Sequence, residues 1–172
     1  MTIIYAAATA LVNPPGASPV LTLKQLWEAL ELKARKPQLF LAVIDTCSVL
    51  EDDGKTVLRE VKFKDGGGVG MAPVIGPKVQ ERITCIAPIS DDAGSGVEVF
   101  QSTGNASKVL NIVSTGTEGE LLLTFTFEWE HKEIEEGSEE ALKKQKQYQE
   151  TAPRGVAGMI NAVREMVKDG KL

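Results

Sequence analysis

Two oppositely charged residues, Arg59 and Glu81, lie in phase with the apolar residues of two predicted strands, 56–64 and 79–87. Arg59 shares its face with Val57, Val61 and Phe63, and Glu81 shares its face with Val79, Ile83, Cys85 and Ala87. Successive strand side chains point to opposite faces, so both charges are expected on the inner, apolar face of a sheet. Neighbouring antiparallel strands can then hold them as a cross-strand ion pair.

This pair has two interpretations. In the functional one, burial tunes Glu81 as a general acid or base, and Arg59 steers an enolate, phenolate or carboxylate. In the structural one, the two residues form a salt bridge that stabilises the sheet. A slip of one residue in strand register would turn both side chains outward, so the pairing itself is also an expectation.

Few other residues could do chemistry. Asp45 and Asn111 lie in phase with apolar neighbours, on strands that alternate less clearly. His131, the single histidine, ends a predicted strand, where a surface position is expected rather than a catalytic one. No second histidine or cysteine cluster is available to bind zinc, so we expect no metal and no other cofactor. The glycine-rich segment 65–77 lacks the Lys-Ser/Thr of a phosphate loop, and it is expected to form a hairpin tip or a lid.

An apolar cavity is predicted from two complementary stripes. In the strand 119–131, alternate residues from Leu121 to Trp129 are apolar, and near the C-terminus another apolar stripe recurs at helical spacing. A helix lying across the inner face of a curved sheet would enclose a ligand site between them. The residues expected to line it are Asp45, Val61, Phe63, Ile83, Asn111, Phe125, Phe127, Trp129, Val156, Met159 and Ile160.

The remaining elements follow from caps, turns and alternation. Thr22 and Gln25 have the form of a capping box, which predicts a helix from there to about Lys36, before Pro37. Strands are predicted at 2–12, 41–50, 56–64, 79–87, 97–102, 108–114 and 119–131. Ser138 can cap the C-terminal helix, which Pro153 should kink or restart. The result is an α+β fold with a seven-stranded curved antiparallel sheet wrapped around a long C-terminal helix.

Composition favours an ordinary globular protein. With 172 residues, 42% hydrophobic and 25% charged, the chain fits a single domain, 1–172. The net charge of -5, with no basic stripe, argues against binding of nucleic acid. No run reaches the length of a membrane span and no signal peptide is evident, so we expect a soluble cytoplasmic protein. Cys47 and Cys85 are expected to be reduced, buried core residues.

Several short motifs together resemble the AtaL-like family of the START, or SRPBCC, superfamily. They are Asn13-Pro14-Pro15-Gly16, Gln25-Leu26-Trp27, Lys33-Ala34-Arg35, Leu58-Arg59-Glu60-Val61, Glu81-Arg82, and Gly119-Glu120-Leu121 through Phe127-Glu128-Trp129 and His131. The resemblance runs from about residue 5 to Leu172. It implies a helix-grip fold, like that of pollen allergens and polyketide cyclases, with a hydrophobic cavity, and it implies no settled catalytic motif.

The leading hypothesis is an enzyme of secondary metabolism. It binds an apolar, polyketide-type or polycyclic metabolite and catalyses a cofactor-free isomerisation, cyclisation or dehydration. Glu81 would be the acid or base and Arg59 the oxyanion partner. The alternatives are a non-catalytic binder or carrier, and a protein-interaction module with an exposed apolar patch. The sequence leaves the ligand and the oligomeric state open.

Overall fold

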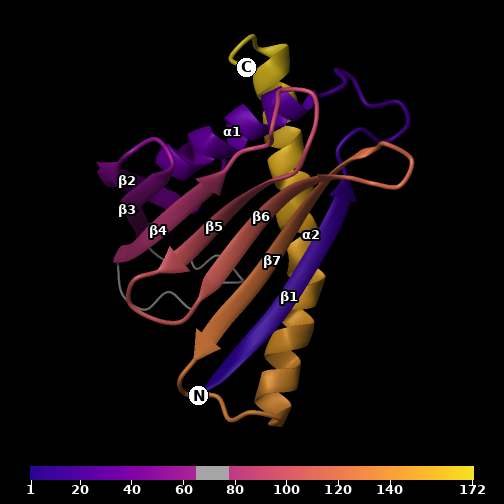
Figure 1. Ribbon diagram of the computed structural model, residues 1–172. Helices are drawn as coiled ribbons and strands as arrows, with labels where there is room; N and C mark the ends of the chain where they lie inside the picture. The colour runs from indigo at the N-terminus through magenta and orange to yellow at the C-terminus, as the bar shows by residue number, and fades with distance from the viewer. Residues whose placement is uncertain (65–77) are drawn as a thin grey trace.

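A seven-stranded antiparallel sheet forms the framework of the protein (Figure 1). The computed structural model describes residues 1–64 and 78–172, so the expectations for segment 65–77 lie outside the described residues. The strands are β1 (Thr2–Leu11), β2 (Ile44–Asp52), β3 (Thr56–Phe63), β4 (Lys78–Ile86), β5 (Gly96–Ser102), β6 (Lys108–Thr115) and β7 (Leu121–His131). They lie in the order β1-β7-β6-β5-β4-β3-β2, which confirms the predicted sheet.

Two α-helices begin at the predicted caps. Helix α1 (Leu23–Arg35) starts after Thr22, whose Oγ1 accepts a hydrogen bond from the Gln25 N–H at 3.1 Å, while the Gln25 side chain accepts one from the Thr22 N–H at 3.0 Å. Helix α2 (Glu139–Lys168) starts after Ser138, whose Oγ accepts from the Ala141 N–H. Each cap satisfies donors that a helix start leaves without partners.

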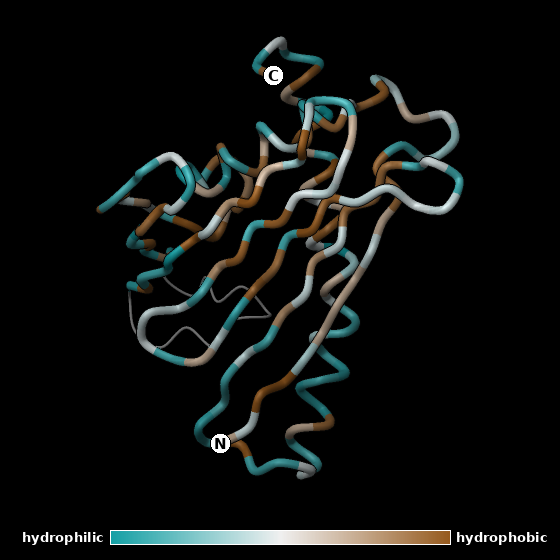
Figure 2. The backbone as a smooth tube through the Cα atoms, in the orientation of Figure 1, coloured by the Kyte–Doolittle hydropathy of each residue, from teal (hydrophilic) through white to brown (hydrophobic). Residues whose placement is uncertain are grey.

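Helix α2 runs without a break through Pro153, so the predicted restart there is wrong. Proline removes one helical hydrogen bond, but buried side chains lie on both sides of it, including Tyr148, Ala152 and Val156. Their packing holds both halves of the helix in place, since tertiary contacts supply most helical stability in proteins. Figure 1 shows α2 running behind β7 and β1, and Figure 2 shows that its first half is mostly hydrophilic.

The end of β7 is tied to α2 by a buried hydrogen bond. The Nε2 atom of His131 lies 2.8 Å from the Tyr148 hydroxyl, and its Nδ1 lies 3.0 Å from a carboxylate oxygen of Glu133. His131 is 2% exposed, so the expectation of a surface histidine is wrong. The physical reason is the apolar phase of β7, which continues to its last residue and meets the tyrosine of the covering helix.

Strand β2 begins three residues later than predicted, because the short 3-10 helix η1 (Pro37–Leu39) follows Pro37. As an edge strand, β2 contacts a neighbour on one side, and most of its residues after Ile44 are exposed. Cys47 is accordingly half-buried rather than a core residue, whereas Cys85 on β4 is buried as expected. Both cysteines are free thiols.

Helix α1 crosses the sheet above β3 to β5 and is anchored at both ends (Figure 1). At its C-terminal end, Arg35 forms a bidentate ion pair at 2.7 and 2.9 Å with Asp52, the last residue of β2. Nearer its start, Trp27 packs directly on Gly96, where an added Cβ would lie 2.6 Å from the indole. These contacts place the last turn of α1 over the inner face of the sheet.

Candidate functional site

A cavity of about 520 Å³ lies on the inner face of the sheet. Strands β3 to β7 supply most of its wall, Lys33 enters it from α1, and Gly155 is the contribution of α2 among the described residues. Its aromatic wall consists of Phe63, Phe100, Phe125, Phe127 and Trp129. Phe127 stacks on Trp129 with ring centroids 5.9 Å apart, so flat apolar surfaces face the space. A cavity of this size and lining suits a drug-sized apolar molecule.

Eight of the predicted site residues contribute to this lining. They are Arg59, Glu81, Val61, Phe63, Asn111, Phe125, Phe127 and Trp129. Their faces follow from the strand register: Arg59 is directly opposite Glu81 in the β3–β4 ladder, and Asn111 is opposite Phe125 in the β6–β7 ladder. The expected register of the two charged residues is therefore confirmed.

The other five predicted residues lie elsewhere. Asp45 is exposed and its carboxylate pairs with Lys62 Nζ at 3.2 Å, because a register irregularity between Ile44 and Thr46 turns it away from the inner face. The side chains of Ile83, Val156, Met159 and Ile160 are buried in the core, outside the cavity lining. The three helical residues follow α2, which packs along β1 and β7 and fills the core there.

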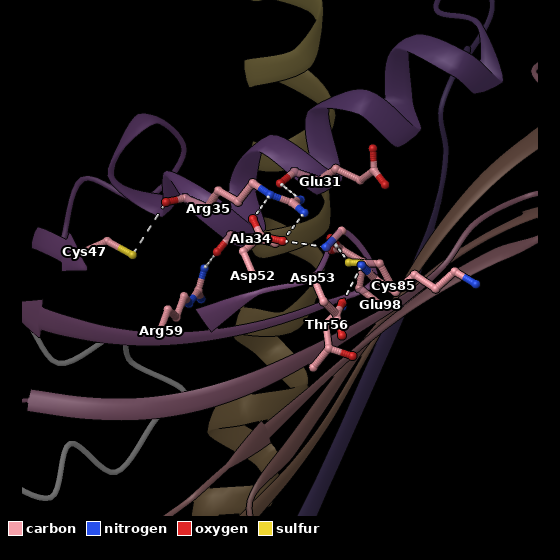
Figure 3. A network of polar contacts seen from close by, with 12 residues as sticks. Glu31, Ala34, Arg35, Cys47, Asp52, Asp53, Thr56, Arg59, Cys85 and Glu98 are labelled. Atoms are coloured by element: carbon pink, nitrogen blue, oxygen red, sulfur yellow. Dashed lines mark hydrogen bonds and ion pairs between the residues drawn. The ribbon is translucent and has the colours of Figure 1, made fainter. Parts of the chain in front are cut away.

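Arg59 forms a network that reaches from β3 to β4 and α1. Figure 3 shows the part of it that joins Arg59 to the α1 backbone at Ala34. Its Nε and Nη2 donate to the same carboxylate oxygen of Glu81, Oε2, at 3.0 and 2.8 Å. Its Nη1 donates to the backbone carbonyls of Lys33 and Ala34 at 2.9 and 2.8 Å. These carbonyls belong to the last turn of α1, which has no later helical N–H to bond them. Arg59 therefore caps the C-terminal end of α1.

This arrangement separates the roles of the two charged residues. Arg59 is 4% exposed and uses four of its five donors on protein acceptors, which makes it a positioning residue for Glu81 and α1. Glu81 is more accessible, with its side chain 22% exposed. Within residues 1–64 and 78–172, its second oxygen, Oε1, forms no hydrogen bond. A carboxylate held by one oxygen can accept or donate a proton with the other.

Lys33 is a cavity residue that the sequence analysis did not identify. Its side chain is 8% exposed and its Nζ lies over two aromatic rings, 4.6 Å from the Phe125 centroid and 5.4 Å from that of Phe100. In the part of the chain that the structure describes, this ammonium group has no ion-pair partner and donates no hydrogen bond. Burial therefore lowers the pKa of Lys33 to about 8, with the Arg59 cation adding to the effect and Glu98 and Glu81 opposing it.

Glu98 on β5 is also buried and was not identified from the sequence. It is opposite Asn111 on β6 and Cys85 on β4. The Asn111 Nδ2 donates to Glu98 Oε2 at 3.0 Å, and the Cys85 Sγ donates weakly to Oε1 at 3.9 Å. Burial raises the pKa of Glu98, while Lys33 and Asn111 oppose this change. Burial, followed by the Glu98 charge, raises the pKa of the Cys85 thiol to about 12, so Cys85 stays protonated.

Two buried polar atoms at the cavity have no hydrogen-bond partner among the described residues. They are the Asn111 Oδ1, an acceptor, and the Trp129 Nε1, a donor. A buried polar group without a partner costs about 1–3 kcal/mol, and native proteins rarely leave one unsatisfied without a reason. Because both residues line the cavity, a ligand that offers one donor and one acceptor would satisfy them.

The sequence contains a pattern that could have identified Lys33, whereas the pattern around Glu98 is ambiguous. Lys33 lies seven residues after Leu26 and three after Leu30, which places it on the apolar stripe of α1. Glu98 is in phase with Phe100, but its neighbours Val97 and Val99 make both faces of that strand apolar. Alternation therefore could not tell which face of β5 is inner, and the ladder to Cys85 and Asn111 settles it.

Across residues 1–64 and 78–172, no three His, Cys, Asp or Glu side chains gather where they could hold a metal ion. Among the helices of the described chain, none combines the length and the apolar composition that crossing a membrane requires.

The sheet, the covering helix and the cavity define the class of protein with a helix-grip fold. Two solved structures share this architecture. The Zhui aromatase/cyclase from Streptomyces sp. R1128 is 11% identical, with a TM-score of 0.61 over 99% of this chain and 97% of that chain. The structure of Ara h 8.0201 is 12% identical, with a TM-score of 0.51 over 98% of this chain and 99% of that chain. These similarities confirm the predicted fold.

The chain belongs to the AtaL family, whose description is acetylaranotin biosynthesis cluster protein L and whose model matches residues 6–170. The resemblance given by the short motifs is thereby confirmed. A search of the curated proteins found no match.

Proposed function

We propose that the protein binds an apolar, polycyclic or polyketide-type metabolite and catalyses a cofactor-free isomerisation, cyclisation or dehydration. The observation that carries this proposal is the cavity, in which an aromatic wall surrounds two polar atoms that the described residues leave without a hydrogen-bond partner. The AtaL family description and the similarity to an aromatase/cyclase support the substrate class. Reactions of this kind require a shaped, dry cavity and a positioned acid or base.

In this proposal Glu81 is the acid or base and Arg59 positions it. The Arg59 guanidinium holds one carboxylate oxygen, and the other is left to exchange a proton with the substrate. This modifies the role expected for Arg59, because its donors on the α1 carbonyls are not available to an oxyanion. The Trp129 N–H, which has no partner within residues 1–64 and 78–172, is a cavity donor that would contact a substrate oxygen instead.

A carrier function is the second candidate. The commitment of Arg59 to α1 favours it, because the cavity loses the cation that the catalytic hypothesis assigned to a developing negative charge. Binding alone requires nothing beyond the apolar wall and the two unsatisfied polar atoms.

Incubation with an extract of the host, followed by chromatography, separates the two functions. A compound that enters with the protein and leaves as a different compound identifies an enzyme, and one that returns unchanged identifies a carrier. The Glu81→Gln protein should retain the compound and lose turnover at least about a hundredfold, the usual size of a general acid–base contribution. Glu51→Gln is the matched control, because Glu51 also pairs with an arginine, Arg82, but at an exposed position. Full turnover by a folded Glu81→Gln protein would remove this mechanism.

A further inference from the structure

Lys33 differs from every surface lysine in its surroundings. It projects from the last turn of α1 into the cavity, and the Phe100 and Phe125 rings flank its ammonium group. Lys24 on the same helix illustrates the ordinary case, since it is half exposed and pairs with Asp91 at 2.8 Å. A primary amine held in an apolar cavity without a protein partner is the arrangement in which lysine acts as a nucleophile.

Asn111 lies close to the same point of the cavity. It is directly opposite Phe125 in the β6–β7 ladder, and Lys33 Nζ lies 4.6 Å from the Phe125 ring centroid. Residues opposite each other in a ladder have Cβ atoms about 4.5–5.5 Å apart. The Asn111 amide donates to Glu98, and this bond orients Oδ1, an acceptor with no partner in the described part of the chain. An amine and a fully buried acceptor thus occupy the same region of the cavity.

We propose that Lys33 forms a reversible imine with a ketone or aldehyde group of the apolar ligand. This inference rests on the ligand class proposed above and adds the functional group that the ligand must carry. Polycyclic and polyketide-type molecules commonly present ketones, so the aromatic wall would bind the ring system while the amine binds the carbonyl carbon.

The step is balanced without an oxidant or a reductant. The lone pair of neutral Nζ forms a bond to the carbonyl carbon, and the π electron pair moves to the oxygen, which takes up the proton that the nitrogen releases. Asn111 Oδ1 accepts a hydrogen bond from the resulting hydroxyl group. Loss of that hydroxyl group with a second nitrogen proton forms the carbon–nitrogen double bond and releases one water molecule.

The environment of Lys33 supplies the neutral amine that this step needs. With its pKa lowered to about 8, about a quarter of the Lys33 side chains are neutral at about pH 7.5. At its ordinary pKa of 10.5, about one lysine in a thousand would be neutral. The charged groups that act on it are Arg59 from β3, Glu81 from β4 and Glu98 from β5.

Reductive trapping tests the imine directly. The full-length protein is incubated with naphthaldehyde and sodium cyanoborohydride at about pH 7.5, where the neutral fraction of Lys33 is already substantial. Intact-mass measurement should show one adduct whose mass equals that of the aldehyde less one oxygen atom. Peptide mapping of the wild-type protein should then place the adduct on Lys33, with labelling that increases as the pH rises toward 8.

Matched variants and a non-carbonyl probe separate the possible failures. Lys33→Met and Lys33→Arg should lose the single adduct, whereas Lys24→Met should keep it. Hydroxymethylnaphthalene has no carbonyl group and tests the cavity alone, by titration calorimetry. Binding of this compound together with adducts spread over surface lysines would overturn the imine and leave the proposed ligand class intact. Absence of binding by either compound would overturn both proposals. Because mapping uses the wild-type protein, the test does not depend on the folding of the Lys33 variants.

Discussion

At the scale of single residues, the Arg59 guanidinium joins three elements of the fold. It bonds Glu81 on β4 and two carbonyls at the end of α1, while its own backbone belongs to β3. Because these acceptors are buried or partly buried, removing the donor leaves them without partners. The structural interpretation of the ion pair and the functional one are therefore compatible, with Arg59 in the first role and Glu81 in the second.

Replacement of Arg59 by methionine should lower the free energy of unfolding by about 3 kcal/mol, since it leaves a partly buried carboxylate and two helix carbonyls unsatisfied. Urea unfolding followed by circular dichroism measures this loss. Arg82→Met is the control, because Arg82 lies 3.6 Å from Glu51 in an exposed ion pair and should cost less than about 1 kcal/mol. Equal losses in the two variants would contradict the anchoring role of Arg59.

The buried Lys33 charge predicts a pH dependence of stability. The unfolded chain keeps the Lys33 proton up to about its ordinary pKa of 10.5, whereas the folded protein releases it near a pKa of about 8. Unfolding therefore takes up a proton between these pH values, and the folded state gains stability as the pH rises through them. Relative to Lys33→Met, the wild-type protein should gain on the order of 3 kcal/mol across this window. A difference between the two proteins that stays constant from pH 8 to 10.5 would contradict the lowered pKa.

At the scale of elements, the site depends on how closely α1 approaches the sheet. The approach is set where Trp27 lies on Gly96 at the start of β5, because any side chain there would meet the indole. Six residues after Trp27, the same helix places Lys33 in the cavity. A displacement of α1 would therefore move the amine as well as loosen the core.

Gly96→Ala tests this close approach, because its new Cβ would lie 2.6 Å from Trp27 and 2.8 Å from Pro88. Overpacking of this kind should lower the free energy of unfolding by about 1–3 kcal/mol. Gly158→Ala in α2 is the opposite case, since its added Cβ would point into open space, with no other packed group of the described residues within 4 Å. An exposed helical glycine replaced by alanine should stabilise the protein by about 0.5–1 kcal/mol. Thermal unfolding should show unfolding temperatures that shift in opposite directions in the two variants. A Gly96→Ala protein with unchanged stability would contradict the packing argument.

At the scale of the whole molecule, alternation and caps predicted the seven strands of the sheet and both α-helices, whereas the strand order, with β1 beside β7, comes from the structure. The inner face of β3 and β4 was also predicted, because Arg59 and Glu81 interrupt clear apolar patterns. Which helical residues line the cavity was harder to predict. An apolar stripe shows that a residue is buried, but it does not show which element buries it. Val156, Met159 and Ile160 therefore fill the core against the sheet, while the cavity lies on the side that α1 reaches. Local sequence patterns do not show this separation between the core and the cavity, because it depends on how α1 and α2 divide the inner face of the sheet.

The position of the cavity, away from the α2 core residues, determines which substitution can fill it. Val109 on β6 lines the cavity opposite Phe127, whereas Val99 on β5 points to the other face of the sheet. Hydroxymethylnaphthalene at about a hundredfold excess over its dissociation constant should stabilise the wild-type protein by about 2.7 kcal/mol. Val109→Trp should abolish this stabilisation by occupying the ligand space, and Val99→Trp should leave it unchanged. Both effects can be measured as ligand-dependent shifts in urea unfolding. Equal ligand responses in the two tryptophan variants would place the binding site outside the cavity between α1 and the sheet.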